Sequence, residues 1–258
     1  RAASHVLPGW TIDGFDQDDR ALNILSEVPR FECLYAGDPA RLPSDYDLIV
    51  LMHALEHIPS PIAMLELLAG KLAPGGHILV EVPDRVANPY DLLVADHVLH
   101  FDRESLRVVG SMSGLVPVEV SQGWVAKELS MVLARDGVPD KSTTPGEPLD
   151  PRRQVDWLGD VVHVAKAAAH RRPLCVFGSS IVGTWIASEL PASPDCYIDE
   201  DPAKVGRTLD GVPIVAPAEA PAGATVILAV APAVAASIAA RLAPLDLSFV
   251  TLPTYPPA

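Results

Sequence analysis

The chain has 258 residues, of which 49% are hydrophobic, and it carries a formal net charge of −14. This length suits one large domain or two ordinary ones, and the apolar content is ample for packed cores. The acidic balance argues against a nucleic-acid partner held through its phosphates. No uncharged apolar run reaches the roughly 18 residues of a membrane span, so we expect no membrane partner either. The 3 cysteines are scattered singly, which fits a reducing cytoplasm.

Strand and helix signals alternate through the first half of the chain. We expect strands at 10–15, 31–38, 47–52 and 77–83, helices at about 18–27 and 60–72, and a turn at the APGG sequence of 73–76. Ser60 followed by Pro61 is a typical helix start. This alternation favours an α/β fold with a parallel, doubly wound sheet. Two further strands, at 116–121 and 128–135, are expected to close this half as an antiparallel hairpin.

A proline-rich segment at 136–151 lacks apolar periodicity and is interpreted as a linker. Beyond it the alternation of strands and helices resumes. We expect helices at about 152–170, 180–190 and 232–243, and strands at 173–178, 195–201, 213–217, 225–230 and 247–252. The prediction is therefore two Rossmann-like domains in tandem: residues 1–137, a linker at 138–151, and a smaller domain at 152–258.

Polar residues follow each strand of the first half. Asp16 lies just past the first strand, where a carboxylate can accept both hydroxyls of a ribose. Gly37 and Asp38 end the second strand, where an acid can accept from an adenine amino group and a glycine admits the flat ring. The third strand runs into LMHALEHIPSP, at the carboxyl end where open α/β sheets bind ligands.

In this order and spacing, and with LAPGGHILVEVP following, most of residues 10–135 resembles the class I S-adenosylmethionine-dependent methyltransferases. The resemblance implies S-adenosylmethionine as the cofactor. The residues that it places around the cofactor are Asp16, Gly37, Asp38, His53, Glu56 and His57. His53, at the end of the third strand, is expected to lie nearest the point of methyl transfer.

Plainer roles remain open for several of these residues. Asp16 could be solvated within its acidic run, Asp38 could cap a helix, and Glu56 with His57 could cap the following segment. The family also carries a glycine-rich loop after its first strand, and the sequence before Trp10 has none. We expect that loop and strand to lie upstream of Arg1. The alternative is a domain that no longer binds the cofactor.

A second motif, ADHVLHFDRESL at 95–106, resembles the EHxxYF-type segment of sugar C-methyltransferases, which carry a downstream Rossmann-like domain. Asp96 stands where that group has Glu, His97 matches its His, and His100 replaces an aromatic residue. The resemblance implies that His97, oriented by Asp96, removes the proton beside a ketone. An imidazole that titrates near neutral pH suits this step. Alternatively, His97 packs under the loop and Asp96 caps it.

In the second half, LCVFGSSIVG precedes CYIDED, so that Asp199 lies 21 residues after Gly178. This spacing is typical of a dinucleotide fingerprint, but Ser180 occupies the place of its second glycine and argues against NAD. The continuation IDEDPAKVGRTLDGVPIVAP resembles the C-terminal domain of the same sugar C-methyltransferases. Ser179, Ser180 and Lys204 are candidate contacts for a nucleotide phosphate. A purely structural domain is the alternative.

These observations predict methyl transfer from S-adenosylmethionine to a small molecule in biosynthesis or secondary metabolism. The second resemblance points to C-methylation of a nucleotide-linked keto sugar, with His97, Asp96 and His100 at the catalytic centre. An O- or N-methyltransferase and a degenerate methyltransferase-fold binding module are the alternatives, and an NAD-dependent oxidoreductase is disfavoured by Ser180. No metal site is expected, and a homodimer is left open.

Overall fold

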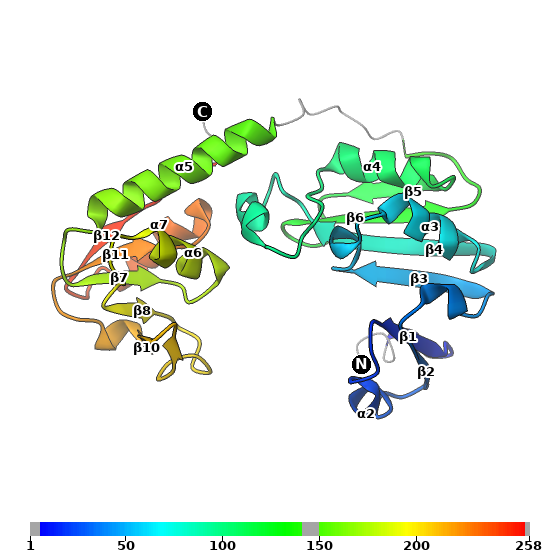
Figure 1. Cartoon of the computed structure of the whole chain (residues 1–258), viewed down its shortest axis with the longest axis horizontal. Helices are drawn as coiled ribbons and strands as arrows, with labels where there is room; N and C mark the ends of the chain where they lie inside the picture. Colours follow the sequence, from blue (N-terminus) through cyan, green and yellow to red (C-terminus); the bar gives the residue numbers. More distant parts are fainter. Residues whose placement is uncertain (1–5, 141–149, 256–258) are drawn as a thin grey trace.

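The computed structural model describes residues 6–140 and 150–255, which form three β-sheets with helices packed on them (Figure 1). Most of the predicted strands are present within one or two residues of their expected bounds. Among the described residues, no helix combines the length and the apolar character needed to cross a membrane.

The first sheet contains only two strands. β1 (Ile12–Asp16) pairs in parallel with β2 (Phe31–Ala36), and Asp16 lies opposite Ala36, so the carboxyl ends of the two strands meet. The expected helix at 18–27 is reduced to the single turn α2 (Leu22–Leu25). One continuous sheet was expected in this half. Instead, within the described chain, β1 and β2 do not pair with the next sheet.

The second sheet has the order β3-β4-β6-β5. Its strands are β3 (Tyr46–Met52), β4 (Leu72–Pro83), β5 (Val116–Ser121) and β6 (Glu128–Ala134). β3 and β4 are parallel, and β5 and β6 form the predicted antiparallel pair. Helix α3 (Pro61–Ala69) begins at Pro61 as expected. The predicted turn at 73–76 was wrong, since these residues belong to β4 at a point where its register with β3 shifts.

Helix α4 (Arg103–Met112) was not expected from the sequence. Its start is a capping box, in which the Asp102 carboxylate accepts from the Ser105 backbone N–H and Ser105 Oγ accepts from the Asp102 N–H. Leu106 is fully buried, and a Cβ at Gly110 would come within 2.8 Å of Leu133. Helix α4 therefore lies close against β6.

The described residues also contain short 3-10 turns: η1 (Pro39–Arg41), η2 (Leu55–His57), η3 (Pro89–Leu93) and η4 (Pro217–Glu219).

The third sheet has the order β12-β11-β7-β8-β10-β9. Its strands are β7 (Leu174–Phe177), β8 (Cys196–Ile198), β9 (Thr208–Leu209), β10 (Val212–Val215), β11 (Ala224–Leu228) and β12 (Leu247–Val250). All pairs are parallel except β9 with β10. The first strand, β7, is central and the chain winds outward to both sides of it. The sheet is therefore doubly wound, with its switch point between β7 and β11.

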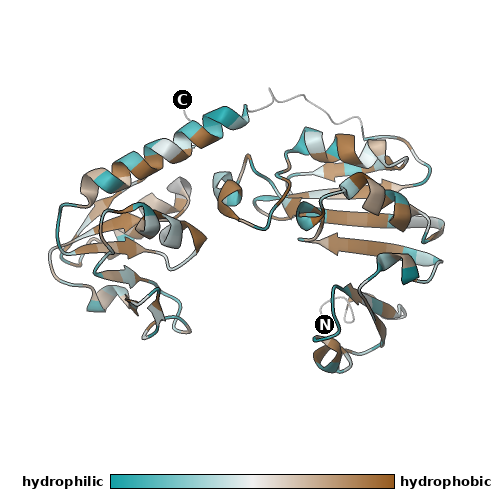
Figure 2. Ribbon diagram, viewed as in Figure 1, coloured by the Kyte–Doolittle hydropathy of each residue, from teal (hydrophilic) through white to brown (hydrophobic). Residues whose placement is uncertain are grey.

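Three helices accompany this third sheet: α5 (Pro151–Ala168), α6 (Ile181–Glu189) and α7 (Pro232–Leu242). The strands are predominantly apolar, whereas α5 shows polar and apolar faces (Figure 2). Trp157 and Val161 of α5 are buried in a cluster that also contains Tyr90 of η3. The division into domains at 137 and 152 stays a prediction, because most of the proposed linker lies outside the described residues. Packing of η3 crosses that division.

Candidate active site

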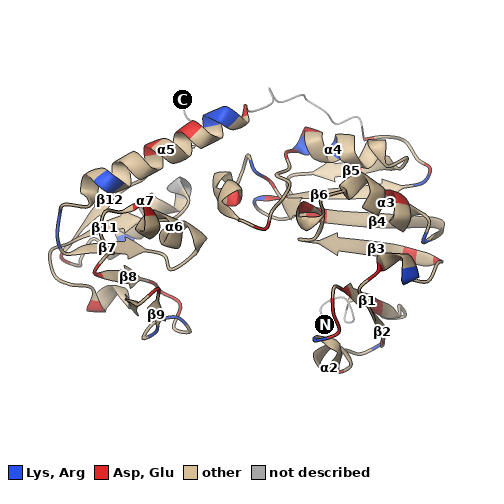
Figure 3. Ribbon diagram, viewed as in Figure 1, with Lys and Arg blue, Asp and Glu red and all other residues tan. Residues whose placement is uncertain are grey.

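Two loops at the carboxyl ends of neighbouring strands build the candidate site. The loop after β3 contains η2 with Glu56 and His57, and the loop after β4 contains η3 and the histidines. The backbone N–H groups of Val98 and Leu99 both donate to the Glu56 carbonyl, at 3.0 and 3.1 Å. This pair of bonds brings together two segments that are about forty residues apart in the sequence. Basic side chains are scattered rather than gathered around these loops (Figure 3).

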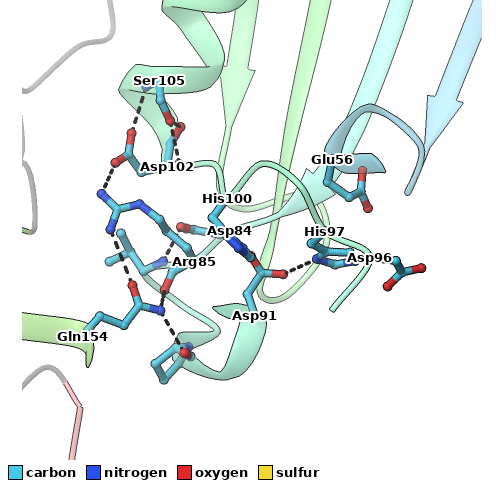
Figure 4. Close-up of polar contacts among 12 residues, drawn as sticks. Glu56, Asp84, Arg85, Asp91, Asp96, His97, His100, Asp102, Ser105 and Gln154 are labelled. Carbon is cyan, nitrogen blue, oxygen red and sulfur yellow. Dashed lines mark hydrogen bonds and ion pairs between the residues drawn. The ribbon is translucent and has the colours of Figure 1, made fainter. Parts of the chain in front are cut away.

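Asp91 is the centre of the histidine cluster. Its carboxylate is buried and lies 2.7 Å from Nδ1 of His97 and 2.6 Å from Nδ1 of His100 (Figure 4). An ionised carboxylate only accepts hydrogen bonds, so with an ionised Asp91 both contacts require the imidazole proton to be on Nδ1. The Nε2 atom of each ring is therefore left as a base. No sequence motif had singled out Asp91. The available signal was an acid in an apolar turn, six residues before His97.

Asp96 does not occupy the position expected from the sequence. Its side chain is 78% exposed, and its carboxylate lies 3.5 Å from Nδ1 of His57. Its backbone carbonyl, at 2.9 Å, is the closer partner of the same nitrogen. The contact that orients His97 is thus made by Asp91. The His57 and His97 rings meet edge to face, with centroids 4.8 Å apart.

Three further titratable groups border the cluster. His53 is 48% exposed, and its Nδ1 lies 3.5 Å from Glu56 Oε1 and 4.0 Å from Glu128 Oε2. Glu56 is buried, and among residues 6–140 and 150–255 neither of its carboxylate oxygens has a hydrogen-bond partner. Burial raises the pKa of Glu128; His53 opposes the shift, and nearby carboxylates, including Glu81 and Glu56, reinforce it. The site therefore brings several acidic side chains close to the imidazoles of His53, His97 and His100.

Among the described residues, two groups of side chains have the composition to hold a metal ion. Glu56, His57 and His97 bring ligand atoms within 4.8 Å of one another, as do Asp91, His97 and His100. The second group is already joined by hydrogen bonds. In the first group the buried Glu56 carboxylate has no hydrogen bond within the described part of the chain. Two histidines with one carboxylate suit a transition-metal ion. No metal site was expected here from the sequence.

The residues expected to hold the cofactor lie at the ends of the strands, as predicted. Asp16 is exposed, and its Oδ1 accepts from the Gln17 N–H at 2.6 Å, so Oδ2 remains available to a ribose. Gly37 has φ +86° and open space around its Cα, which suits a flat ring. Asp38 caps η1 through the Ala40 N–H at 2.9 Å, the plainer role considered for it. The arrangement fits the adenosine part of S-adenosylmethionine.

A cavity of about 660 Å³ lies between β1 and β3. It is lined by Trp10, Ile12, Leu48 and neighbouring residues. Tyr46 Oη of β3 donates to Asp13 Oδ2 of β1 at 2.8 Å, and this hydrogen bond joins the two strands beside the cavity. None of the expected cofactor residues lines this cavity. Its position follows from the separation of β1 and β2 from the second sheet.

In the third sheet, the candidate phosphate contacts converge on Asp199. Its Oδ2 accepts from the backbone N–H and Oγ of Ser179, at 3.0 and 2.5 Å, and from Lys204 Nζ at 3.3 Å. Burial would raise the pKa of Asp199, but these bonds and the Asp201 N–H outweigh it and lower the pKa to about 2. Ser180 instead lines a cavity of about 480 Å³ that Leu93 of η3 also borders.

Comparison with known proteins supports the family resemblance of the first half of the chain. Residues 4–120, a little under half of the chain, match the family model of a methyltransferase domain. This match and the curated relatives below support a class I S-adenosylmethionine-dependent methyltransferase domain in this segment. The methyltransferase segment contains both loops of the histidine site and the strand ends that carry Asp16 and Asp38.

Curated relatives of this methyltransferase segment are ubiquinone biosynthesis O-methyltransferases. The protein from Ralstonia nicotianae is 30% identical over 108 residues, covering 38% of this chain and 45% of the relative. The protein from Thiobacillus denitrificans is 31% identical over 101 residues, covering 35% and 44%. The chain thus spans a little under half the length of these relatives. Among solved structures, the mitomycin 7-O-methyltransferase MmcR aligns with a TM-score of 0.45 at 15% identity, covering 52% of this chain and 44% of that one.

Proposed function

We propose that the protein transfers a methyl group from S-adenosylmethionine to a small molecule and that His97 acts as the general base. The observation that carries this proposal is the bond from His97 Nδ1 to buried Asp91, which leaves Nε2 as the proton acceptor. The bond stabilises the imidazolium that forms when the base takes up a proton. His100 shares Asp91 and provides a second, similarly oriented imidazole.

Each part of the site has a distinct task in this reaction. When bound, the cofactor supplies an electrophilic methyl group on a sulfonium. Asp16 and Gly37 would hold the adenosine part, and His53 and Glu56 lie beyond the end of β3. His97 Nε2 takes the proton of the acceptor, whose electron pair then forms the new bond to the methyl carbon as the carbon–sulfur bond breaks.

An oxygen acceptor is the first candidate, because the matched relatives are named as O-methyltransferases. A carbon acceptor beside a ketone is the second, and the cavity between Leu93 and Ser180 favours it. That cavity lies between η3 and the third sheet. A bulky substrate such as a nucleotide-linked keto sugar bound there could contact η3 and the third sheet at the same time. In this case Ser180, which lines the cavity, would lie near its phosphates, and Ser179 and Lys204 would contact them only by giving up their bonds to Asp199.

Calorimetric titration with S-adenosylmethionine and its demethylated product tests the cofactor site. Asp16→Ala should weaken binding at least about tenfold, because the ribose loses a carboxylate acceptor. Asp18→Ala is the matched control, since Asp18 pairs with Arg20 at the surface, and its affinity should stay within about twofold. An absence of heat with either ligand would favour a methyltransferase-fold binding module.

A deuterium wash-in experiment separates the two acceptors. The protein is incubated in heavy water with a nucleotide-linked keto sugar and no methyl donor. Exchange at the carbon beside the ketone that disappears in His97→Ala supports the carbon route. If no such exchange occurs, and a parallel assay with S-adenosylmethionine methylates phenols or sugar hydroxyls, the oxygen route is supported. A wild-type methylation rate in His97→Ala would remove His97 from the mechanism under both routes.

An NAD-dependent reaction in the third sheet is not favoured, because Asp199 is already engaged by Ser179 and Lys204. Titration with NADH, followed by fluorescence, would revive it if Asp199→Ala abolished tight binding. A cytoplasmic location and a homodimer stay predictions.

A further inference from the structure

The turn that carries Asp91 packs against the third sheet rather than the second. Tyr90 of η3 is buried in the same cluster as Trp157, and their rings are 5.1 Å apart. Leu92 and Leu93 pack against that cluster as well. An element of the methyltransferase segment thus depends on the C-terminal half for its apolar environment. The turn that contacts the histidine pair therefore has packing partners outside the second sheet.

Gln154 of α5 provides the polar part of this contact and is completely buried. Its Nε2 donates to the Pro89 carbonyl at 2.8 Å and to the Arg85 carbonyl at 3.3 Å. Its Oε1 accepts from Arg85 Nη1 at 3.5 Å. All these partners belong to the loop after β4, as Figure 4 shows. A buried amide whose bonds all cross to one loop fixes that loop with directional bonds, which apolar packing alone cannot supply.

The bond to Pro89 acts close to the histidine pair. Pro89 begins η3, and Asp91, two residues later, lies in the same turn, where its N–H donates to the Asn88 carbonyl. A shift of this turn would move the Asp91 carboxylate relative to His97 and His100, which it contacts at 2.7 and 2.6 Å. Hydrogen bonds this short tolerate displacements of only a few tenths of an ångström.

We propose that Gln154 is a positioning residue for the histidine pair: through Pro89 it places Asp91 so that both imidazoles keep their proton on Nδ1 and present Nε2 as the base. The C-terminal half is then required for the chemistry of the methyltransferase segment and is more than an attached domain. The effect on turnover rests on the proposed function, whereas the effect on the imidazole protons does not.

The test is a comparison of histidine side-chain ¹⁵N spectra of the full chain at a pH where the imidazoles are neutral. Signals are assigned with His97→Gln and His100→Gln, and Asp91→Ala gives the spectrum of rings without their acceptor. Gln154→Leu retains bulk but removes the amide. It should move both rings from the Nδ1–H form toward the Nε2–H form, in the same direction as Asp91→Ala.

Val155→Ala is the matched control, because Val155 is the exposed neighbour of Gln154 on α5. Its spectrum should equal that of the wild type. Methyl transfer by Gln154→Leu should fall at least about tenfold in kcat, while the affinity for S-adenosylmethionine stays within about twofold. Gln154→Asn, whose amide is too short to reach Pro89, should give the same spectral change if the leucine variant does not fold.

A merely structural role predicts a different result. In that case Gln154→Leu and Gln154→Asn lower the melting temperature but leave the tautomers of His97 and His100 unchanged, and the proposal is overturned. Tautomer shifts in a protein that transfers no methyl group would sustain the positioning role and reject the proposed function.

Discussion

Replacing Asp91 by asparagine should damage both the stability and the activity of the protein. The buried carboxylate accepts from two imidazole N–H groups, and bonds to a charged acceptor contribute about 1.5–3 kcal/mol each. An asparagine oxygen can replace one acceptor, but its amide hydrogens then face the other Nδ1–H. One ring must therefore lose its bond or turn over. We expect the free energy of unfolding to fall by about 1.5–3 kcal/mol.

The same loss sets the expected effect on the rate. If the missing bond counts fully in the transition state, about 1.36 kcal/mol per factor of ten gives a rate about 10- to 150-fold lower. Urea denaturation measures the stability, and formation of S-adenosylhomocysteine with an accepted substrate measures the rate. Asp96→Asn is the control, because its carboxylate is exposed, and it should change the stability by less than about 0.5 kcal/mol. A silent Asp91→Asn beside a damaging Asp96→Asn would refute the assignment of the orienting acid.

Gly183→Ala should destabilise the protein by several kcal/mol in urea denaturation, because the new Cβ would lie 1.9 Å from the Gly178 carbonyl oxygen. This is roughly the cost of forcing a core side chain into occupied space. Gly159→Ala, which has open space in α5, should instead stabilise the protein by up to about 1 kcal/mol. Asp102→Ala should cost about 1–2 kcal/mol at neutral pH through loss of the α4 cap. Burial raises the pKa of Asp102, but its hydrogen bonds to Ser105 and Arg85 outweigh burial and lower the pKa. The difference in stability between Asp102→Ala and wild type should therefore vanish as the pH falls through the folded-state pKa. A stability difference that persists in acid would contradict this origin. The raised pKa of Glu128 has the opposite sign: folding favours its protonated form, so its destabilising effect grows as the pH rises above the ordinary value of 4.5. Glu128→Gln should therefore be more stable than wild type at pH 8 and equal to it at pH 4 in thermal melts, and equal stability at both would count against a buried carboxylate.

Local sequence signals determined most of the secondary structure. Apolar runs such as DLIVLM and LCVF became β3 and β7, and Pro61 marked the first turn of α3, because these signals depend on near neighbours in the chain. The terminal antiparallel pair of the second sheet was also confirmed. The family of the first half followed from the order of motifs at strand ends, which the match over residues 4–120 confirms.

Helix α4 was missed although its capping pair, Asp102 and Ser105, is present in the sequence. The helix has few apolar residues, so its sequence shows little helical periodicity. Its stability comes mainly from the burial of Leu106 against β6. The single expected sheet in the first half was divided for a similar reason. Strand pairing joins residues distant in the chain, and no local pattern specifies which edges meet.

The histidine site shows what only the tertiary structure decided. The resemblance of residues 95–106 to a segment of sugar C-methyltransferases identified His97 as the candidate base and His100 as a further catalytic candidate. It assigned the orienting role to Asp96, the adjacent acid, whereas the fold turns that side chain outward and buries Asp91 between the two rings. Which carboxylate meets an imidazole depends on how η3 packs against α5, more than fifty residues later in the chain. Composition and spacing carry no information on such a contact, because it is fixed by the packing of distant segments.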